Sequence, residues 1–337
     1  MENESYGSVC VEGGDGLGKG DATQRMLSEL ELEGVNITYS SFPIYATPIG
    51  TALRLLLRNG YEDLTPENDL DVRMALFAMN RLEFMDAYLS DKEKYKNSLL
   101  VLDRSPYSNA LTVAYGLSSG ENWEDEDILK YIENGMDYDR LISSRLGLGR
   151  CVIQLKAEEE EWHNSRNCEV DQYEKSEVQE MCDKVYGLYR DHVVKGGWNE
   201  VITRKDGNWK GRDEIWAEIN DILFRTYGLM GDIRGGERHD IGFKEIVGNM
   251  YPGAKYDKGM FGIYDRALKG NEKSLMYENG LALGGQIAKS ECLNIRISNP
   301  EVEEEFRRLY NLPQMRDVFV HFLGRRFVAK LERGLEI

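Results

Sequence analysis

The sequence predicts an α/β fold with a parallel sheet flanked by helices, followed by a second, smaller domain. Three observations lead to this prediction. Short apolar runs rich in β-branched residues alternate with helical patterns over the first two thirds of the chain. A glycine-rich loop follows the first of these runs, and the balance of charge changes near residue 228. The chain of 337 residues is long enough for two such domains.

The apolar runs predict five strands. They cover residues 8–11, 35–42, 98–103, 151–157 and 200–203. Helical patterns between them predict helices over residues 19–33, 66–89, 107–116, 124–146, 171–195 and 211–227. Right-handed crossovers then bring the carboxyl ends of the strands together, so we expect the loops after Val11 and Leu102 to lie along one crevice.

The chain is predicted to divide near residue 228. Residues 1–228 carry 25 Lys and Arg against 43 Asp and Glu, whereas residues 229–337 carry 17 against 16. The stretch GLMGDIRGGERHDIG, rich in glycine, follows the boundary. We expect residues 229–337 to form a small α+β domain of unknown role, with one clear amphipathic helix in NPEVEEEFRRLYNLP.

Composition narrows the function classes. The net charge of −17 argues against a general nucleic-acid coat or an anionic membrane surface as partner, because both favour positive proteins. The five cysteines are scattered and include no C-x-x-C pair, which favours reduced thiols over a disulfide framework or a zinc site. The acidic N-terminus lacks the pattern of a signal peptide, and no run approaches the roughly 18 apolar residues of a membrane span. We therefore expect a cytoplasmic protein.

The stretch EGGDGLGKGD, at residues 12–21, indicates a phosphate-binding loop. It follows a predicted strand and precedes a predicted helix, and Lys19 stands where such loops carry a mobile positive charge. Gly20 replaces the usual metal-ligating hydroxyl residue. The alternative is a glycine-rich turn with a chance lysine. The candidate ATP-binding residues are Gly13, Gly14, Asp15, Gly16, Leu17, Gly18, Lys19, Gly20 and Asp21.

The strand SLLVLD ends in Asp103, followed at once by Arg104. A carboxylate at this position suits Mg²⁺ directly or through water, and a guanidinium suits a phosphate group. Taken alone, Asp103 is better explained as a capping residue at the end of a strand, and the phosphate-binding loop is what favours the functional role.

Three further stretches, FPIYATPIG (42–50), LFAMNRLE (76–83) and DRSPYSNALTVAYG (103–116), follow the loop in order. Together the four motifs resemble the thymidylate kinase family over about residues 6–227. The resemblance implies a P-loop nucleoside-monophosphate-kinase fold that phosphorylates dTMP with ATP and Mg²⁺, and typically a homodimer.

The resemblance also implies residue roles. Asp15 contacts the deoxyribose 3′-hydroxyl, Phe77 stacks on thymine, and Arg81 donates to a base carbonyl. Asp103 belongs to the magnesium environment and Arg104 clamps the acceptor phosphate. The remaining substrate-binding candidates are Phe42, Pro43, Tyr45, Arg54, Ser108 and Asn109. From the residues alone, Phe77 is also explained as a core aromatic, and Ser108 and Asn109 as helix-start capping residues.

Residues 158–174 lie where the family has a lid. Arg166 is the candidate lid cation, because the loop has Gly16 where some members carry arginine. The alternative is an incidental arginine in a solvated acidic segment. Tyr173 is a further candidate contact with the nucleotide.

Two departures from the family pattern bear on activity. Ile44 and Tyr45 follow the Phe-Pro pair where many members have an arginine, and Arg54 is the next basic residue. Asp21 adds a negative charge near the phosphate turn, either toward the β-phosphate or outward.

The sequence therefore predicts an ATP-dependent nucleoside monophosphate kinase that acts on dTMP. Two alternatives stay open. One is a kinase for another deoxynucleoside monophosphate or a deoxynucleoside. The other is a nucleotide-binding regulator or scaffold with weak catalysis.

Overall fold

The described residues of the computed structural model form two compact units, each built from two stretches of chain. Unit 1 comprises Met1–Phe42 and Glu93–Asp240, and unit 2 comprises Pro43–Lys92 and Ile241–Ile337. The described residues are 7–14, 16–118, 123–158, 173, 176–205, 208–228, 236–270 and 272–337. This division differs from the boundary in chain order near residue 228, because residues 43–92 group with the C-terminal segment.

Unit 1 contains a mostly parallel sheet. Its strands in the described residues are β1 (Ser8–Glu12), β2 (Ile37–Ser41), β3 (Leu99–Asp103), β4 (Cys151–Ala157), β5 (Trp198–Lys205), β6 (Asn208–Trp209) and β7 (Arg238–Asp240). The strand order is β6-β5-β4-β1-β3-β2-β7, and only the β5–β6 pair is antiparallel. The predicted α/β fold with a parallel sheet is confirmed.

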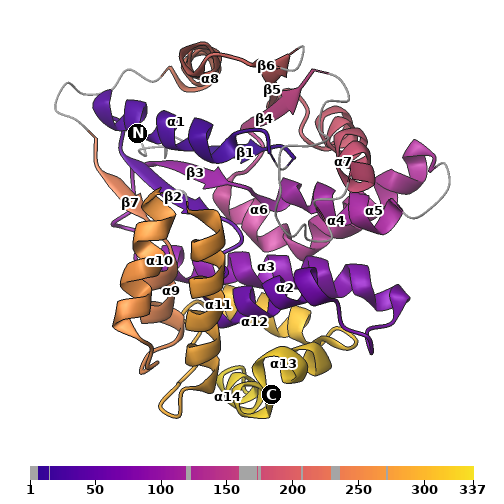
Figure 1. Ribbon diagram of the computed structural model, residues 1–337, viewed down its shortest axis with the longest axis vertical. Coiled ribbons are helices and arrows are strands. Elements are labelled where there is room, and N and C mark those ends of the chain that lie inside the picture. The colour runs from indigo at the N-terminus through magenta and orange to yellow at the C-terminus, as the bar shows by residue number, and fades with distance from the viewer. Residues whose placement is uncertain are drawn as a thin grey trace. The chain divides into compact units, whose positions relative to one another are not determined.

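Helices cover the sheet of unit 1. They are α1 (Lys19–Leu32), α4 (Asn109–Leu117), α5 (Asp125–Tyr138), α6 (Arg140–Leu146), α7 (Ser176–Leu188) and α8 (Arg212–Tyr227), with the short η1 (Pro106–Ser108) and η2 (Tyr189–Val193). Alternate strand residues such as Val9 and Val11 join a buried apolar core with α1 and α8. Figure 1 shows α1 and α8 on one side of the strands and α4, α5 and α7 on the other.

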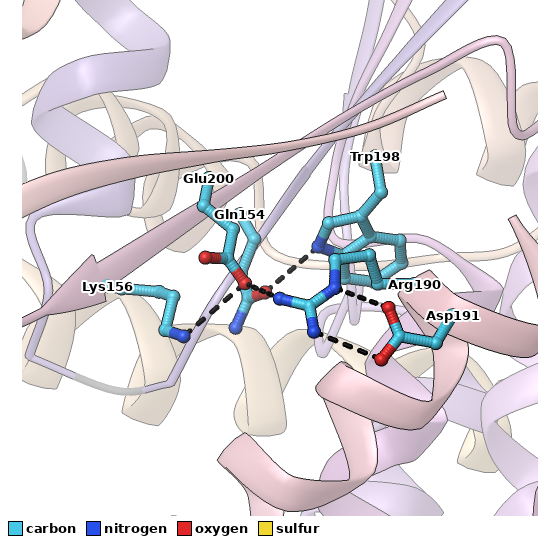
Figure 2. Close-up of polar contacts among 6 residues, drawn as sticks. All are labelled: Gln154, Lys156, Arg190, Asp191, Trp198 and Glu200. Atoms are coloured by element: carbon cyan, nitrogen blue, oxygen red, sulfur yellow. Dashed lines mark hydrogen bonds and ion pairs between the residues drawn. The ribbon is translucent and has the colours of Figure 1, made fainter. Parts of the chain in front are cut away.

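The π-helical turn η2 is tied to strand β5 by polar contacts (Figure 2). Arg190 pairs with its neighbour Asp191 at 2.7 Å and with Glu200 on β5 at 2.7 Å, and Lys156 approaches Glu200 from β4 at 3.3 Å. The Arg190 guanidinium lowers the pKa of the Asp191 carboxyl. These side chains are partly exposed, so each pair contributes little to stability.

Unit 2 is helical in its described residues. Helices α2 (Pro48–Asn59) and α3 (Pro66–Ser90) pack with α9 (Phe243–Met250), α10 (Lys258–Gly270), α11 (Lys273–Lys289), α12 (Pro300–Tyr310), α13 (Met315–Leu323) and α14 (Arg325–Gly334). Figure 1 shows these later helices, coloured orange to yellow, beside the purple α2 and α3. Helix α2 contacts α11 and α13, and α3 contacts α9 and α12.

The segment after residue 228 therefore differs from the expected α+β domain. Its single described strand, β7, pairs with β2 in the sheet of unit 1. The apolar stretch LNIRIS at 293–298 forms no strand, and its Arg296 N–H donates to the Met250 carbonyl at the end of α9. A run of β-branched residues forms a strand only where another strand is available to pair with it, and that depends on the fold around it.

The prediction also missed α2, which begins within the second motif. Thr47 is its N-cap and accepts a hydrogen bond from Gly50 N at 3.1 Å, and Pro48 is the first helical residue. The Thr-Pro pair is a start signal that the sequence contained. None of the helices in the described part of the chain has the length and hydropathy needed to cross a membrane.

Candidate nucleotide-binding site

The loop after β1 has the backbone that a phosphate-binding turn requires. Gly13, Gly16 and Gly18 have φ values of 130°, 83° and 77°, a region that side chains disfavour. A Cβ on Gly13 would overlap the Leu155 carbonyl oxygen of β4, so only glycine fits there. Gly18 is the N-cap of α1, and the loop therefore leads directly into a helix N-terminus, where N–H groups and the helix dipole favour an anion.

Lys19 is the first residue of α1, and its side chain is directed back over the loop. Its Nζ donates to the Gly13 carbonyl at 2.8 Å and to the Gly14 carbonyl at 2.5 Å, and only 8% of the residue is exposed. The ammonium group is therefore held at the loop. Asp15 lies outside the described residues.

The two unusual residues after the lysine lie in open surroundings. A Cβ on Gly20 would have no atom within 4 Å. The Asp21 carboxylate forms an ion pair of 2.7 Å with Arg212 of α8, and both side chains are more than half exposed. Because Asp21 is paired with a cation of a neighbouring helix, its charge is partly compensated at the start of α1.

A buried carboxylate lies at the end of β1, immediately before the loop. Glu12 is fully buried and accepts hydrogen bonds from Ser105 N at 2.8 Å, Ser105 Oγ at 2.6 Å, Ser108 Oγ at 2.5 Å and Tyr186 OH at 3.1 Å. Burial raises the pKa of Glu12, and the hydroxyl donors and the positive charge of Arg104 oppose that rise. Glu12 was not among the predicted site residues, although a charged residue at the end of an apolar strand is a visible signal in the sequence.

Asp103 and Arg104 lie beside this loop because β1 and β3 are adjacent. Val11 is in register with Asp103, and Arg104 N donates to the Val11 carbonyl at 3.0 Å. Ser41 Oγ donates to Asp103 Oδ2 at 3.2 Å. Arg104 has φ 68°, an uncommon conformation for a residue other than glycine, and such backbone strain is concentrated at functional sites.

The Asp103 carboxylate beside the glycine-rich loop is a suitable type of ligand for magnesium. The described residues contain no group of three His, Cys, Asp or Glu side chains placed to share a metal ion, and Asp103 provides a single carboxylate beside the loop. Mg²⁺ is commonly held by one or two carboxylates together with substrate phosphates and water. A single carboxylate at this edge of the sheet is compatible with a magnesium ion held mainly by phosphates and water.

Three candidates of the pyrimidine and lid regions have partners within unit 1. Ser108 donates to Glu12, as described above, and the fully buried Asn109 donates from Nδ2 to Asp139 Oδ2 at 2.9 Å. The hydroxyl group of Tyr173 lies 3.1 Å from Thr112 Oγ1. The candidate lid cation Arg166 lies outside the described residues.

The substrate candidates divide between the two units. The buried Phe42 follows β2, and its N–H donates to the Asp103 carbonyl at 2.9 Å, whereas Pro43 begins the chain of unit 2. In unit 2, the Arg81 guanidinium carbon lies 5.7 Å from the centre of the Phe77 ring. Arg81 is 2% exposed, whereas Phe77 is only partly buried.

Arg54 lies against two aromatic rings in unit 2. Its guanidinium carbon is 5.4 Å from the centre of the Tyr45 ring and 4.7 Å from that of Tyr277 on α11. The sequence analysis missed Tyr277, which lies 223 positions after Arg54 in a segment with no recognisable motif.

The chain has a similar solved structure but no matching family model or curated sequence. No protein-family model matches this chain, and no curated protein sequence matches it. Among solved structures, the chain is similar to a thymidylate kinase from Candida albicans, with 19% sequence identity and a TM-score of 0.45. That match covers 65% of this chain and 91% of the Candida chain. A function therefore has to be argued from the residues of the chain itself.

Proposed function

We propose that this chain is an ATP-dependent nucleoside monophosphate kinase whose acceptor is dTMP. One observation carries the proposal: a glycine-rich loop with a lysine held over it lies next to a strand end that carries Asp103 and Arg104. Phosphoryl transfer needs such convergent positive charge more than it needs a nucleophilic side chain. The order of the four sequence motifs supports dTMP as the acceptor.

In this proposal the residues of unit 1 hold the ATP phosphates. The N–H groups of the loop and of the first turn of α1 bind phosphate oxygens, and Lys19 places its ammonium against the β and γ phosphates. Arg104 stabilises the negative charge that spreads over the transferring group. Magnesium, when bound near Asp103, neutralises phosphate charge. No general base is required, because the acceptor phosphate is already anionic.

The motif residues of unit 2 supply groups suited to an acceptor nucleotide. Phe77 offers an aromatic face for the base and Arg81 offers donors for a base carbonyl, while Arg54 offers a guanidinium for the acceptor phosphate. A phosphate held by a planar, two-pronged donor group is fixed in orientation as well as in position.

A coupled assay for ADP release tests the proposal. The full chain is assayed with dTMP, the three other deoxynucleoside monophosphates and the corresponding deoxynucleosides. We expect turnover with dTMP and a loss of at least about 100-fold in kcat for Lys19→Met, because a preorganised charge on the transferring group is removed. Turnover with another acceptor and none with dTMP would replace dTMP by that acceptor.

Binding separates a kinase from a regulator. The Trp209 ring lies 3.3 Å from the position of a Cβ on Gly18 and is 55% exposed, so its fluorescence is a suitable reporter for ATP at the loop, with Trp209→Phe as the control. Binding of ATP and dTMP without transfer to any acceptor would favour the regulator or scaffold. Homodimer formation is part of the proposal and is checked by light scattering.

A further inference from the structure

The Arg54 side chain lies against two aromatic rings that come from distant parts of the sequence and contact each other. Tyr45 precedes α2 and Tyr277 belongs to α11, and their ring centres lie 5.3 Å apart at an interplanar angle of 77°. The guanidinium carbon lies within 5.4 Å of both ring centres. A guanidinium over an aromatic face is stabilised by the ring quadrupole and presents its N–H donors in its own plane. Both tyrosine rings are therefore near enough to the guanidinium to favour particular orientations of its plane.

Helix α11 is packed closely enough on α2 to fix the position of Tyr277. A Cβ on Gly284 would overlap Thr51 Oγ1 and would lie 2.6 Å from the Thr47 carbonyl oxygen. One turn earlier, the Cβ position of Gly280 lies 3.5 Å from the backbone N of Ala46. Arg58 of α2 also pairs with Glu278 of α11 at 2.9 Å. The backbone next to Tyr277 therefore touches the backbone next to Tyr45.

The segment from Ile44 to Thr47, which contains Tyr45, is also connected to the C-terminal segment through hydrogen bonds. Tyr251 donates to Glu83 Oε1, and Thr47 donates to Glu83 Oε2 at 2.6 Å. Asn80 accepts from the Ile44 N–H at 2.8 Å and donates to the same Glu83 Oε2 at 2.8 Å. The segment from Ile44 to Thr47, which includes Tyr45, is thus fixed by hydrogen bonds to α3 and, through them, to the C-terminal segment.

We propose that Tyr277 is a positioning residue for the acceptor phosphate, by which the C-terminal helices complete the acceptor site of this kinase. Tyr277 acts through Arg54: its ring, together with Tyr45, keeps the guanidinium oriented so that its planar donors meet the phosphate oxygens. This inference rests on the proposed function. It gives residues 229–337 a role in substrate binding that their sequence does not indicate.

The test measures dTMP affinity by calorimetry and ATP affinity by Trp209 fluorescence, on the full chain. We expect Tyr277→Leu to weaken dTMP binding about tenfold and to leave ATP binding within about twofold of the wild type. Tyr277→Phe keeps the ring and is expected to bind dTMP within about twofold of the wild type. Leu275→Ala, an exposed position on the same helix, is the matched control and is expected to change neither affinity.

A double-mutant cycle distinguishes positioning from a separate contact. If Tyr277 acts through Arg54, Arg54→Ala combined with Tyr277→Leu binds dTMP as weakly as Arg54→Ala alone. Additive losses would overturn the inference. So would unchanged dTMP binding in Tyr277→Leu, or equal losses of dTMP and ATP binding.

The proposed function is judged separately, on the wild-type chain. A wild type that binds dTMP without transferring phosphate overturns the kinase proposal. In that case the dTMP affinities of the Tyr277 and Arg54 variants still decide the positioning role. A wild type that transfers phosphate while Tyr277→Leu keeps full dTMP affinity overturns only the positioning role. A wild type that binds none of the four deoxynucleoside monophosphates overturns the positioning role.

Discussion

At the scale of single residues, the phosphate loop depends on a few backbone positions and one ammonium group. Gly13 and Gly18 have positive φ values, and Lys19 donates to the loop carbonyls. Gly20, in contrast, has no steric reason to be glycine, because a Cβ there would meet nothing within 4 Å. Steric crowding therefore does not explain why Gly20 stands where such loops usually carry a serine or threonine.

Gly20→Ser tests this directly. We expect the serine to be accommodated without loss of melting temperature, since serine is the better helix former of the two by about half a kcal/mol. A hydroxyl beside Lys19 adds a magnesium ligand, so the Mg²⁺ concentration needed for half-maximal ATP binding is expected to fall severalfold. Titration of Mg²⁺ at fixed ATP measures it. An unchanged Mg²⁺ requirement would mean that the metal is held without this position.

Glu83 gives unit 2 a predictable dependence on pH. It is buried among Thr47, Asn80 and Tyr251, and burial raises its pKa to about 8 from 4.5. Between about pH 4.5 and 8 the unfolded chain has released this proton and the folded chain retains it, so stability falls as pH rises through this range. Above about pH 8 this contribution is constant.

Glu83→Gln is expected to flatten this decline, because the amide does not titrate. Urea unfolding at several pH values between 5 and 9 measures the slope for both proteins. Asp86 keeps part of the slope in the variant, because burial raises its pKa as well. An equally steep decline in Glu83→Gln would show that Glu83 is ionised in the folded protein.

At the scale of elements, the decisive packing in unit 2 is between α2 and α11. The two glycines of α11 that face this contact, Gly280 and Gly284, are four positions apart and so lie on one face of the helix. They differ in how close the neighbouring backbone approaches. This difference allows a matched pair of variants that carry the same chemical change.

Gly284→Ala is expected to destabilise the protein by about 1–3 kcal/mol or more, because its methyl group would collide with backbone and side-chain atoms of α2. At Gly280 the nearest atom is 3.4 Å from the Cβ position, an ordinary contact. Gly280→Ala is therefore expected to be neutral or to stabilise the helix by up to about 1 kcal/mol. Thermal and urea unfolding compare the two, and equal effects would contradict the close packing at Gly284.

At the scale of the whole molecule, the two compact units are not consecutive along the chain. Residues 43–92 interrupt the sequence of unit 1 and pack with residues 241–337 in unit 2. A chain cut near residue 228 therefore removes the helices that cover α2 and α3. Helix α2, which packs on α11 and α13, carries fully buried apolar side chains such as Leu53 and Leu56 in the intact chain.

We expect the fragment of residues 1–228 to aggregate or to unfold without a sharp transition, since it exposes a large apolar surface. Size-exclusion chromatography and a circular-dichroism melt measure this against the full chain. A monomeric fragment with a cooperative melt and the dTMP affinity of the full chain would show that the C-terminal helices are dispensable.

The parts of the fold that follow from local pattern were predictable. Apolar β-rich runs identified β1 to β5, and the glycine-rich stretch before Lys19 identified a loop between β1 and α1. The predicted helix over 124–146 is divided at Asp139, which is buried and accepts from Asn109. That break depends on a partner 30 positions earlier, and periodicity within one window carries no information about it.

The sequence by itself determined the alternating βα pattern, the glycine loop with Lys19, and the Asp103–Arg104 pair, because strand propensity, positive-φ glycines and charge are properties of neighbouring residues. Only the tertiary structure decided that α11 packs on α2 and that Tyr277 lies against Arg54. Contacts between residues more than 200 positions apart depend on which surfaces meet when the core forms. No local pattern in either segment encodes that choice, since a tyrosine and two glycines on a helix are compatible with many partners.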